Sequence, residues 1–188
     1  RRVRLRRKLH GLILESLTGA TARDYFALFQ IEPSFDIDTE ALERAYHTLL
    51  SQFHPDRFAG KSQVEQRVAA QLCADINSGF RTLSAEVARA EYVLKRAGVD
   101  LKQAEREGVG TDFLMTQIAL RERLEAIDTD DTAALQALLV EIQACYRTSR
   151  DAFASTAKSE HFQDAARHWQ EMCYLSKLQE ATAPLGKT

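Results

Sequence analysis

Residues 51–61 read SQFHPDRFAGK and lie between two long segments in which apolar residues recur at helical spacing. The apolar face of the first segment consists of Leu42, Ala45, Tyr46, Leu49, Leu50 and Phe53. The apolar face of the second consists of Val68, Leu72, Ile76, Phe80 and Leu83. The first helix must end before Pro55, because proline disfavours the helical conformation of the residue before it. Two helices of similar length with a short connection pack antiparallel, so the quoted stretch is predicted to be the exposed tip of a helical hairpin.

The rest of the chain follows the same helical spacing. Only three prolines and eight glycines occur in 188 residues, and the alternation of apolar and polar residues that is typical of strands is missing. We therefore predict an all-α protein. Further helices are predicted at 23–29, 85–97, 112–128, 132–157 and 160–181. The last three have short connections and are expected to form a three-helix bundle.

A change in composition separates two helical modules. Residues 98–112, GVDLKQAEREGVGTD, hold three of the eight glycines and few apolar residues, which is typical of a linker. The chain is therefore predicted to form two modules rather than one bundle. The predicted parts are a basic extension at 1–20, a first module at 21–95, a linker at 96–110, a three-helix bundle at 111–181 and a tail at 182–188.

The charge of the chain is unevenly distributed. The formal net charge of −2 gives no overall attraction to nucleic acid. No apolar run reaches the roughly 20 residues needed to cross a bilayer, so neither a nucleic-acid nor a membrane partner is expected. Residues 1–10, RRVRLRRKLH, nevertheless hold six Arg or Lys residues. This extension fits a solvated tail, an arm attracted to acidic surfaces such as nucleic acid, or a targeting segment, and these alternatives stay open.

The three cysteines, Cys73, Cys145 and Cys173, are far apart and form no CxxC pair. An odd number of cysteines at such spacings disfavours both a disulfide framework and a zinc site. They are predicted to be free thiols, mostly buried, in a reducing compartment. No metal or other cofactor is expected.

His54-Pro55-Asp56, at the centre of the tip, admits several interpretations. A catalytic role would need a paired nucleophile or a Gly-rich phosphate loop, and neither is found, so no enzymatic activity is expected. Two ligands are too few for a closed metal site. Taken alone, the tripeptide favours a plain turn, because proline fixes φ and aspartate is common in turns.

The surrounding motifs change this balance. DYFALF at 24–29, QFHPDRF at 52–58 and INSGFRTLS at 76–84 together resemble the J domain of DnaJ-type co-chaperones. The resemblance implies that the loop binds a DnaK-type chaperone and accelerates its ATP hydrolysis. The chaperone-binding residues that it implies are His54, Pro55, Asp56, Tyr46, Arg44, His47 and Arg57.

The tip has the chemistry of a small polar docking element. An exposed imidazole can donate and accept hydrogen bonds, and the Asp56 carboxylate can bind a partner arginine. Pro55 lowers the entropy that is lost when the loop docks. The preceding helix of the family is usually rich in Lys and Arg, whereas here it carries Arg44 and His47 beside Glu43. Weaker electrostatic steering of the partner is therefore expected.

Two further motifs narrow the resemblance. RAEYVL at 89–94 and FLMTQIALRERLEAI at 113–127 are similar to the HscB family, the J proteins of iron–sulfur cluster biogenesis, and the resemblance covers residues 24–181. It implies that the bundle binds an IscU-type scaffold protein, which the J domain delivers to the specialised ATPase chaperone HscA. The scaffold-binding residues that it implies are Leu114, Met115, Ile118, Arg121, Glu122 and Tyr174.

The helix at 112–128 carries two apolar stripes at helical spacing. The first consists of Phe113, Leu120, Leu124 and Ile127. The second consists of Leu114, Met115, Ile118 and Ala119. A bundle helix usually needs one stripe for its core. The second stripe is either buried against the linker or first module, or exposed as a patch for a partner, and the resemblance favours the patch.

These observations lead to the expectation of a monomeric co-chaperone of the bacterial cytoplasm. A mitochondrial location is disfavoured, because some eukaryotic relatives of the family carry an N-terminal cysteine-based metal module and no cysteine precedes Cys73 here. The alternative is a general J-domain adaptor for DnaK that binds another client and has no iron–sulfur role.

Overall fold

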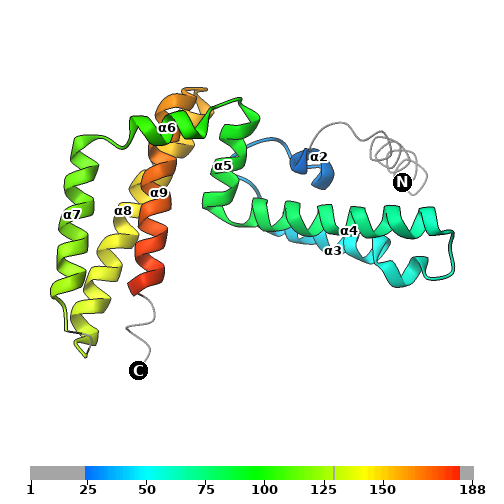
Figure 1. Cartoon of the computed structure of the whole chain (residues 1–188), viewed down its shortest axis with the longest axis horizontal. Helices are drawn as coiled ribbons and strands as arrows, with labels where there is room; N and C mark the ends of the chain where they lie inside the picture. Colours follow the sequence, from blue (N-terminus) through cyan, green and yellow to red (C-terminus); the bar gives the residue numbers. More distant parts are fainter. Residues whose placement is uncertain (1–23, 129, 183–188) are drawn as a thin grey trace. The chain divides into compact units, whose positions relative to one another are not determined.

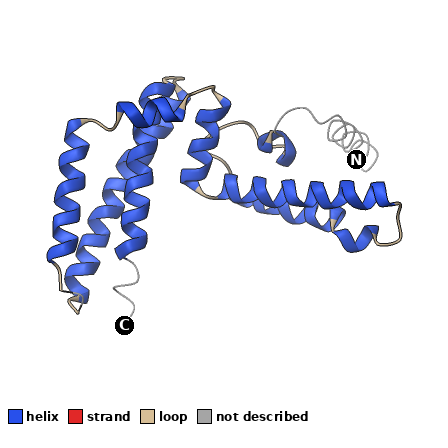
Figure 2. Cartoon of the chain, in the orientation of Figure 1, coloured by secondary structure: helices blue, strands red, loops and turns tan. Residues whose placement is uncertain are grey.

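The computed structural model describes residues 24–128 and 130–182. Within those residues the regular elements are helices and no strand occurs, which confirms the all-α prediction (Figure 1, Figure 2). The predicted extension at 1–20 and the tail beyond residue 182 lie outside the described residues. In the described part of the chain, no helix is long and apolar enough to cross a membrane.

The described chain forms two compact units, of which the first holds residues 24–33 and 37–84, and the second holds residues 34–36 and those from 85 onward. The elements of the first unit are α2 (Tyr25–Phe29), α3 (Thr39–Phe53), the 3-10 helix η1 (Pro55–Phe58) and α4 (Gln63–Ser84). Those of the second are α5 (Glu86–Arg96), α6 (Leu101–Glu107), α7 (Thr111–Ala126), α8 (Thr132–Lys158) and α9 (Phe162–Thr182). The α5 helix thus falls in the second compact unit, while the domain bounds drawn from the sequence stay predictions.

The helices α3 and α4 pack side by side as the hairpin of the first unit (Figure 1). Asp38 caps α3, because its carboxylate accepts a hydrogen bond from the Ala41 backbone N–H at 2.9 Å. The helix ends at Phe53, as Pro55 requires. The buried apolar residues of the two helices are Leu42, Phe53, Ala69, Leu72, Ile76 and Leu83. The short α2 packs against α4 and buries two phenylalanines and a leucine of its own.

Gly79, in the C-terminal part of α4, allows α2 to approach closely. A Cβ atom at this position would lie 2.9 Å from Phe29 Cε2 and 2.9 Å from Tyr25 Cδ1. We predict that Gly79→Ala destabilises the fold by about 1 kcal/mol in urea denaturation. Overpacking costs about 1–3 kcal/mol, which exceeds the gain of about 1 kcal/mol in helix propensity. The control is Gly60→Ala, because a Cβ there meets nothing within 4 Å, and equal stabilities of the two variants would contradict the prediction.

In the second unit, α7, α8 and α9 form the predicted bundle. One cluster of its core consists of the buried residues Leu120, Leu138, Ile142, Leu175 and Leu178. Phe113, Leu124 and Ile127 pack against this cluster. The first apolar stripe of α7 therefore faces the bundle core, which confirms the assignment made from its spacing.

A second cluster of the same unit contains Phe35, from the loop between α2 and α3. The Phe35 ring contacts the Phe153 ring edge-on, with centroids 4.6 Å apart. The guanidinium carbons of Arg89 and Arg150 each lie 5.2 Å from the Phe35 centroid, at a distance typical of cation–π contacts. Burial lowers the pKa of Arg89, and its Nε donates a hydrogen bond to the Phe35 carbonyl at 2.7 Å. The short segment at 34–36 is thereby anchored in the second unit.

Part of the predicted linker is helical. Asp100 caps α6, because its carboxylate accepts hydrogen bonds from the backbone N–H groups of Lys102 at 3.0 Å and Gln103 at 3.2 Å. Ala104 is buried in the Phe35 cluster, and Gly108, with φ 73°, follows the last helical residue. A helix of seven residues is too short for its spacing to be recognised in the sequence.

Candidate functional site

The tripeptide His54-Pro55-Asp56 joins the end of α3 to η1. Proline is favoured in the first turn of a helix, where its missing N–H costs nothing, and Pro55 occupies that position in η1. The His54 Nδ1 atom accepts a hydrogen bond from the Asp56 backbone N–H at 3.4 Å. In a neutral ring with this arrangement, Nε2–H stays free to donate to a partner. The His54 and Asp56 side chains are 56% and 89% exposed, so the tip is a polar surface element.

Arg57 fixes the tip to the helix before it. Its backbone N–H donates to the His54 carbonyl at 3.0 Å, and its guanidinium donates to the Ser51 carbonyl at 2.7 Å. The second bond satisfies one of the carbonyls that the end of α3 leaves without a helical partner. Phe53, directly before the tip, is buried and anchors the last turn of α3 in the hairpin core. The tripeptide is therefore exposed but held from its N-terminal side.

The other chaperone-binding residues implied by the sequence are in different environments. The Tyr46 ring stacks on Phe80, with centroids 4.1 Å apart, and its hydroxyl donates to Asn77 Oδ1 at 3.0 Å. Tyr46 is therefore partly used in packing α3 on α4. Arg44 lies ten residues before His54, and its guanidinium contacts Glu40 at 3.3 Å and Asp38 at 3.7 Å.

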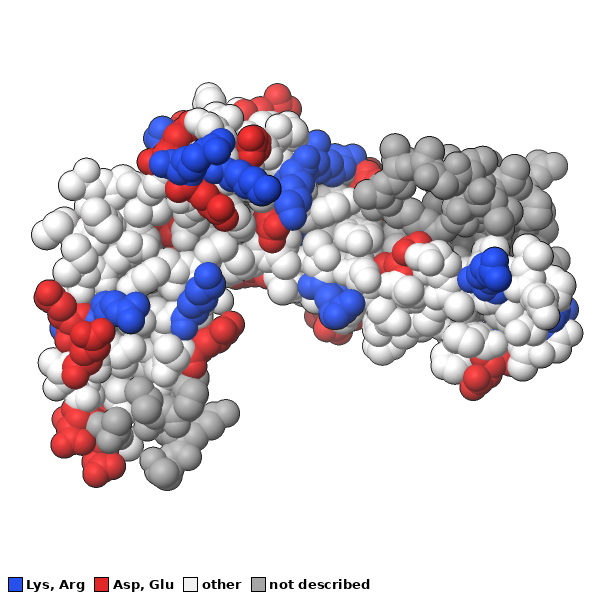
Figure 3. All heavy atoms as spheres, viewed as in Figure 1, with Lys and Arg blue, Asp and Glu red and all other residues white. Residues whose placement is uncertain are grey.

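His47 is exposed on α3, in ring contact with its neighbour Tyr46. The structure thus brings Arg57 directly to the tip, whereas Arg44 is engaged with two carboxylates elsewhere on α3. On the visible face of the described residues, Lys and Arg side chains lie beside Asp and Glu side chains rather than in one continuous basic surface (Figure 3).

The helix α7 exposes an apolar patch, here called the α7 patch, which consists of Leu114, Met115 and Ile118. Their exposed fractions are 46%, 61% and 44%. In the described chain, Val64 and Val140 are the other large apolar residues that are similarly exposed. A contiguous exposed apolar patch is typical of a surface that binds a partner. Within the second unit the second apolar stripe is therefore exposed rather than buried, and its use as a partner surface stays a prediction.

Polar residues and one tyrosine surround the α7 patch. Arg121 and Glu122 are exposed one turn further along α7, and Arg121 Nε contacts Glu125 at 3.1 Å. Tyr174, on α9, is half-buried, and its hydroxyl donates to the Gln117 carbonyl of α7 at 3.2 Å. This bond fixes the tyrosine against the same helix, so all six implied scaffold-binding residues lie on or against α7.

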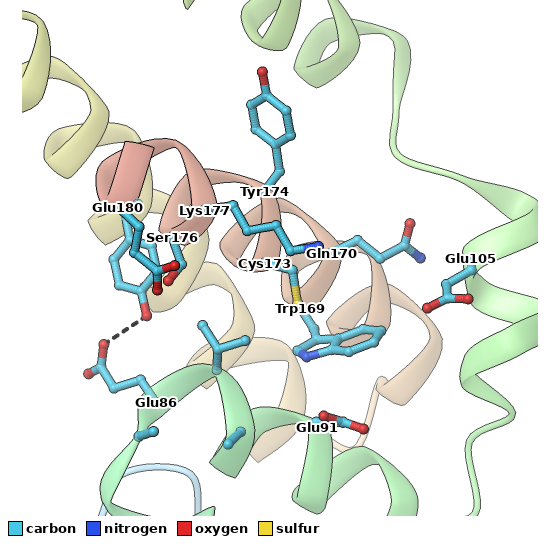
Figure 4. A pocket seen from close by; sticks show the side chains of 14 residues that line it. Glu86, Glu91, Glu105, Trp169, Gln170, Cys173, Tyr174, Ser176, Lys177 and Glu180 are labelled. Carbon is cyan, nitrogen blue, oxygen red and sulfur yellow. Dashed lines mark hydrogen bonds between the residues drawn. The ribbon is translucent and has the colours of Figure 1, made fainter. Parts of the chain in front are cut away.

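A groove that sequence reasoning missed lies on the second unit, between α5, α6, α8 and α9, with a volume of about 880 Å³ (Figure 4). Its wall includes Trp169, Cys173 and Tyr174. Burial raises the pKa of Cys173 to about 11, so its thiol stays protonated at neutral pH and is a poor nucleophile. No group of three potential metal ligands occurs among the described residues.

The partly buried thiol gives a pH-dependent prediction. We expect the alkylation rate of Cys173 to rise about tenfold per pH unit until the pH approaches about 11, because only the thiolate reacts. Site-resolved mass spectrometry after short exposure to iodoacetamide at a series of pH values measures this rate. A rate that levels off near pH 9, the ordinary value for a cysteine, would show that burial does not protect this thiol.

Comparisons with known proteins agree with this arrangement. The family model described as "HSCB C-terminal oligomerisation domain" matches residues 109–183. The Co-chaperone protein HscB homolog of Neisseria meningitidis serogroup C is 45% identical over 120 residues, which are 63% of this chain and 72% of that protein. The homolog of Bordetella petrii is 37% identical over 169 residues, which are 88% of this chain and 99% of that protein.

Two solved structures share the fold over most of their length. Chaperone HscB from Vibrio cholerae has a TM-score of 0.77 at 29% identity and covers 86% of this chain and 96% of its own. Human co-chaperone protein HscB has a TM-score of 0.81 at 26% identity and covers 88% of this chain and 83% of its own. The chain therefore belongs to the HscB family of co-chaperones, the J-domain proteins that work with a partner chaperone in iron–sulfur cluster assembly.

Proposed function

We propose that this protein stimulates ATP hydrolysis by an HscA-type chaperone and delivers an IscU-type scaffold protein to it. The observation that carries the proposal is the presence of two exposed binding elements on separate compact units. One is the polar tip His54-Pro55-Asp56, and the other is the α7 patch. The protein acts by binding, and the chaperone performs the chemistry.

The tip suits a transient, polar contact with the chaperone. Its imidazole and carboxylate offer hydrogen-bond groups to a partner, and a carboxylate–arginine pair is among the stronger of such contacts. The restraints from Arg57 reduce the conformational entropy that binding must remove. Arg57 and His47 are proposed to flank the contact. The bonded Arg44 and half-buried Tyr46 are proposed to act at its edge.

The α7 patch suits a longer-lived contact with the scaffold. Leu114, Met115 and Ile118 supply the apolar centre, and burial of apolar surface is the dominant favourable term in most protein–protein association. Arg121 and Glu122 are proposed to form the polar rim, with Tyr174 at its side. A chain that holds both partners raises the concentration of the scaffold near the chaperone.

The bacterial relatives support a role in the bacterial cytoplasm rather than in mitochondria. The chain is 45% and 37% identical to the two bacterial proteins named above and 26% identical to the human one. A monomeric state remains a prediction.

The test is steady-state ATP hydrolysis by purified HscA and, separately, DnaK, each with this protein and with or without IscU. Strong stimulation of HscA that increases further with IscU is expected. Stimulation of DnaK alone, indifferent to IscU, would instead favour a general J-domain adaptor with another client. No stimulation of either chaperone would refute the proposed use of the tip.

A further inference from the structure

The segment that follows the tip is tied back to the first turn of α4 by side chains of that helix. Residues 59–62 connect η1 to α4 and are exposed. Gln66, in the first turn of α4, donates hydrogen bonds from its amide nitrogen to the Lys61 carbonyl at 2.9 Å and the Ala59 carbonyl at 3.4 Å. One amide thereby holds two carbonyls of a connection that has no buried side chain to anchor it.

This restraint reaches the tip through backbone hydrogen bonds. The Lys61 N–H donates to the Phe58 carbonyl at 2.9 Å, and the Arg57 N–H donates to the His54 carbonyl at 3.0 Å. The tip is thus held from its N-terminal side by the Arg57 guanidinium on Ser51, and from its C-terminal side by Gln66.

A reciprocal cap supports the same side of the loop. The Glu65 N–H donates to Ser62 Oγ at 3.3 Å and the Ser62 N–H donates to Glu65 Oε2 at 3.0 Å, which is the capping box of α4, and the Ser62 hydroxyl donates to the same Oε2 at 2.7 Å. The Ser62 hydrogen bonds lower the pKa of Glu65. This box fixes the start of α4. Because Gln66 lies in the first turn of that helix, its side chain is held in a defined direction toward the connection.

Nothing in the hairpin core requires a glutamine at this position. Gln66 is exposed, and its side-chain hydrogen bonds both go to the connection before α4. We infer that Gln66 is a positioning residue for the His54-Pro55-Asp56 tip, which it preorganises for the chaperone. The inference rests on the proposed function. A loop that is ordered before binding loses less conformational entropy on docking, so its contribution is to affinity.

The test compares Gln66→Met with the wild-type protein in the HscA assay. Methionine keeps the length and helix propensity of glutamine but cannot donate a hydrogen bond. The concentration of co-chaperone that gives half-maximal stimulation is expected to rise about threefold to tenfold, as the loss of a hydrogen bond predicts. Maximal stimulation at saturation is expected to stay the same, because the tip itself is intact. Gln66→Lys, which keeps a donor, is expected to recover part of the affinity.

The matched control is Gln71→Met, on the same helix. Gln71 is exposed and its amide donates to Asp75 at 3.0 Å, away from the loop. Amide hydrogen exchange gives a readout that does not depend on the chaperone: exchange at Arg57 and Lys61 is expected to accelerate in Gln66→Met and not in Gln71→Met. If wild-type protein fails to stimulate HscA, the proposed function fails, whereas unchanged exchange or unchanged half-maximal concentration in Gln66→Met overturns the inference alone. A fall in maximal stimulation without a shift in half-maximal concentration also overturns it.

Discussion

The His54→Gln variant is expected to leave the ATPase rate of HscA at the value of the chaperone alone. Glutamine keeps a hydrogen-bonding side chain of similar length, but it lacks the imidazole ring whose Nδ1 accepts from the Asp56 N–H. The variant is therefore expected to lose both the imidazole contact with the chaperone and the hydrogen bond that shapes the local turn. The side chain is more than half exposed, so the free energy of unfolding is expected to change by no more than about 0.5 kcal/mol. Steady-state ATP hydrolysis and urea denaturation measure the two quantities.

Scaffold binding should be unaffected in the same variant, since the α7 patch belongs to the other compact unit. Isothermal titration of IscU into each variant checks this. His161→Gln is the matched control, because His161 is also exposed but lies in the second unit. It is expected to stimulate HscA as well as wild-type protein does. If His54→Gln lost scaffold binding while its fold was unchanged, the two activities would not be carried by separate surfaces.

Local patterns were sufficient to predict the long helices and the tip, but not the short α6. The α3 boundaries follow from the Asp38 cap and from Pro55, both of which act within a few residues of the chain. The division of α7 into two stripes follows from helical spacing, and Leu120 is buried while Met115 is 61% exposed. Signals of this kind depend on one helix at a time, so the sequence contains them in full.

Contacts between distant segments could not be predicted in this way. Phe35 is 54 residues from Arg89, which donates to its carbonyl, and the ion pair between Arg150 and Asp36 joins residues 114 positions apart. An arginine in a helix is usually exposed, so the sequence gives no sign that Arg89 and Arg150 contact residues far away in the chain. The place of the 34–36 segment in the second unit depends on this tertiary packing, which periodicity does not report.

The sequence also could not predict the environments of the candidate site residues. The family resemblance supplied His54, Asp56 and the α7 patch, and the structure shows that these are exposed. The resemblance could not show that the Tyr46 ring is stacked on Phe80 or that the Arg44 guanidinium contacts two carboxylates. Those environments arise between neighbouring turns and helices. The sequence therefore predicted which residues are candidates, and the structure ranks how freely each of them can reach a partner.

Replacing Leu114 and Met115 together with alanine is expected to weaken IscU binding about a hundredfold. Truncation of exposed apolar residues at the centre of an interface costs about 3 kcal/mol for two such side chains, which corresponds to that factor in Kd. Both side chains are about half exposed in the free protein, so their removal leaves no large cavity. The free energy of unfolding is expected to fall by less than about 1 kcal/mol. Titration calorimetry with IscU and thermal denaturation measure the two effects.

Val140→Ala is the matched control, because Val140 is 52% exposed but lies on α8, outside the α7 patch. It removes apolar surface without touching the patch and is expected to bind IscU like the wild-type protein. A Leu114 and Met115 double variant that unfolds several degrees earlier would identify these residues as core, since truncation of a buried leucine costs about 2–5 kcal/mol. Wild-type affinity in a stable double variant would instead exclude these two residues of the patch from scaffold binding. Stimulation of HscA without added IscU should be the same in all three proteins, since that activity depends on the tip of the first unit.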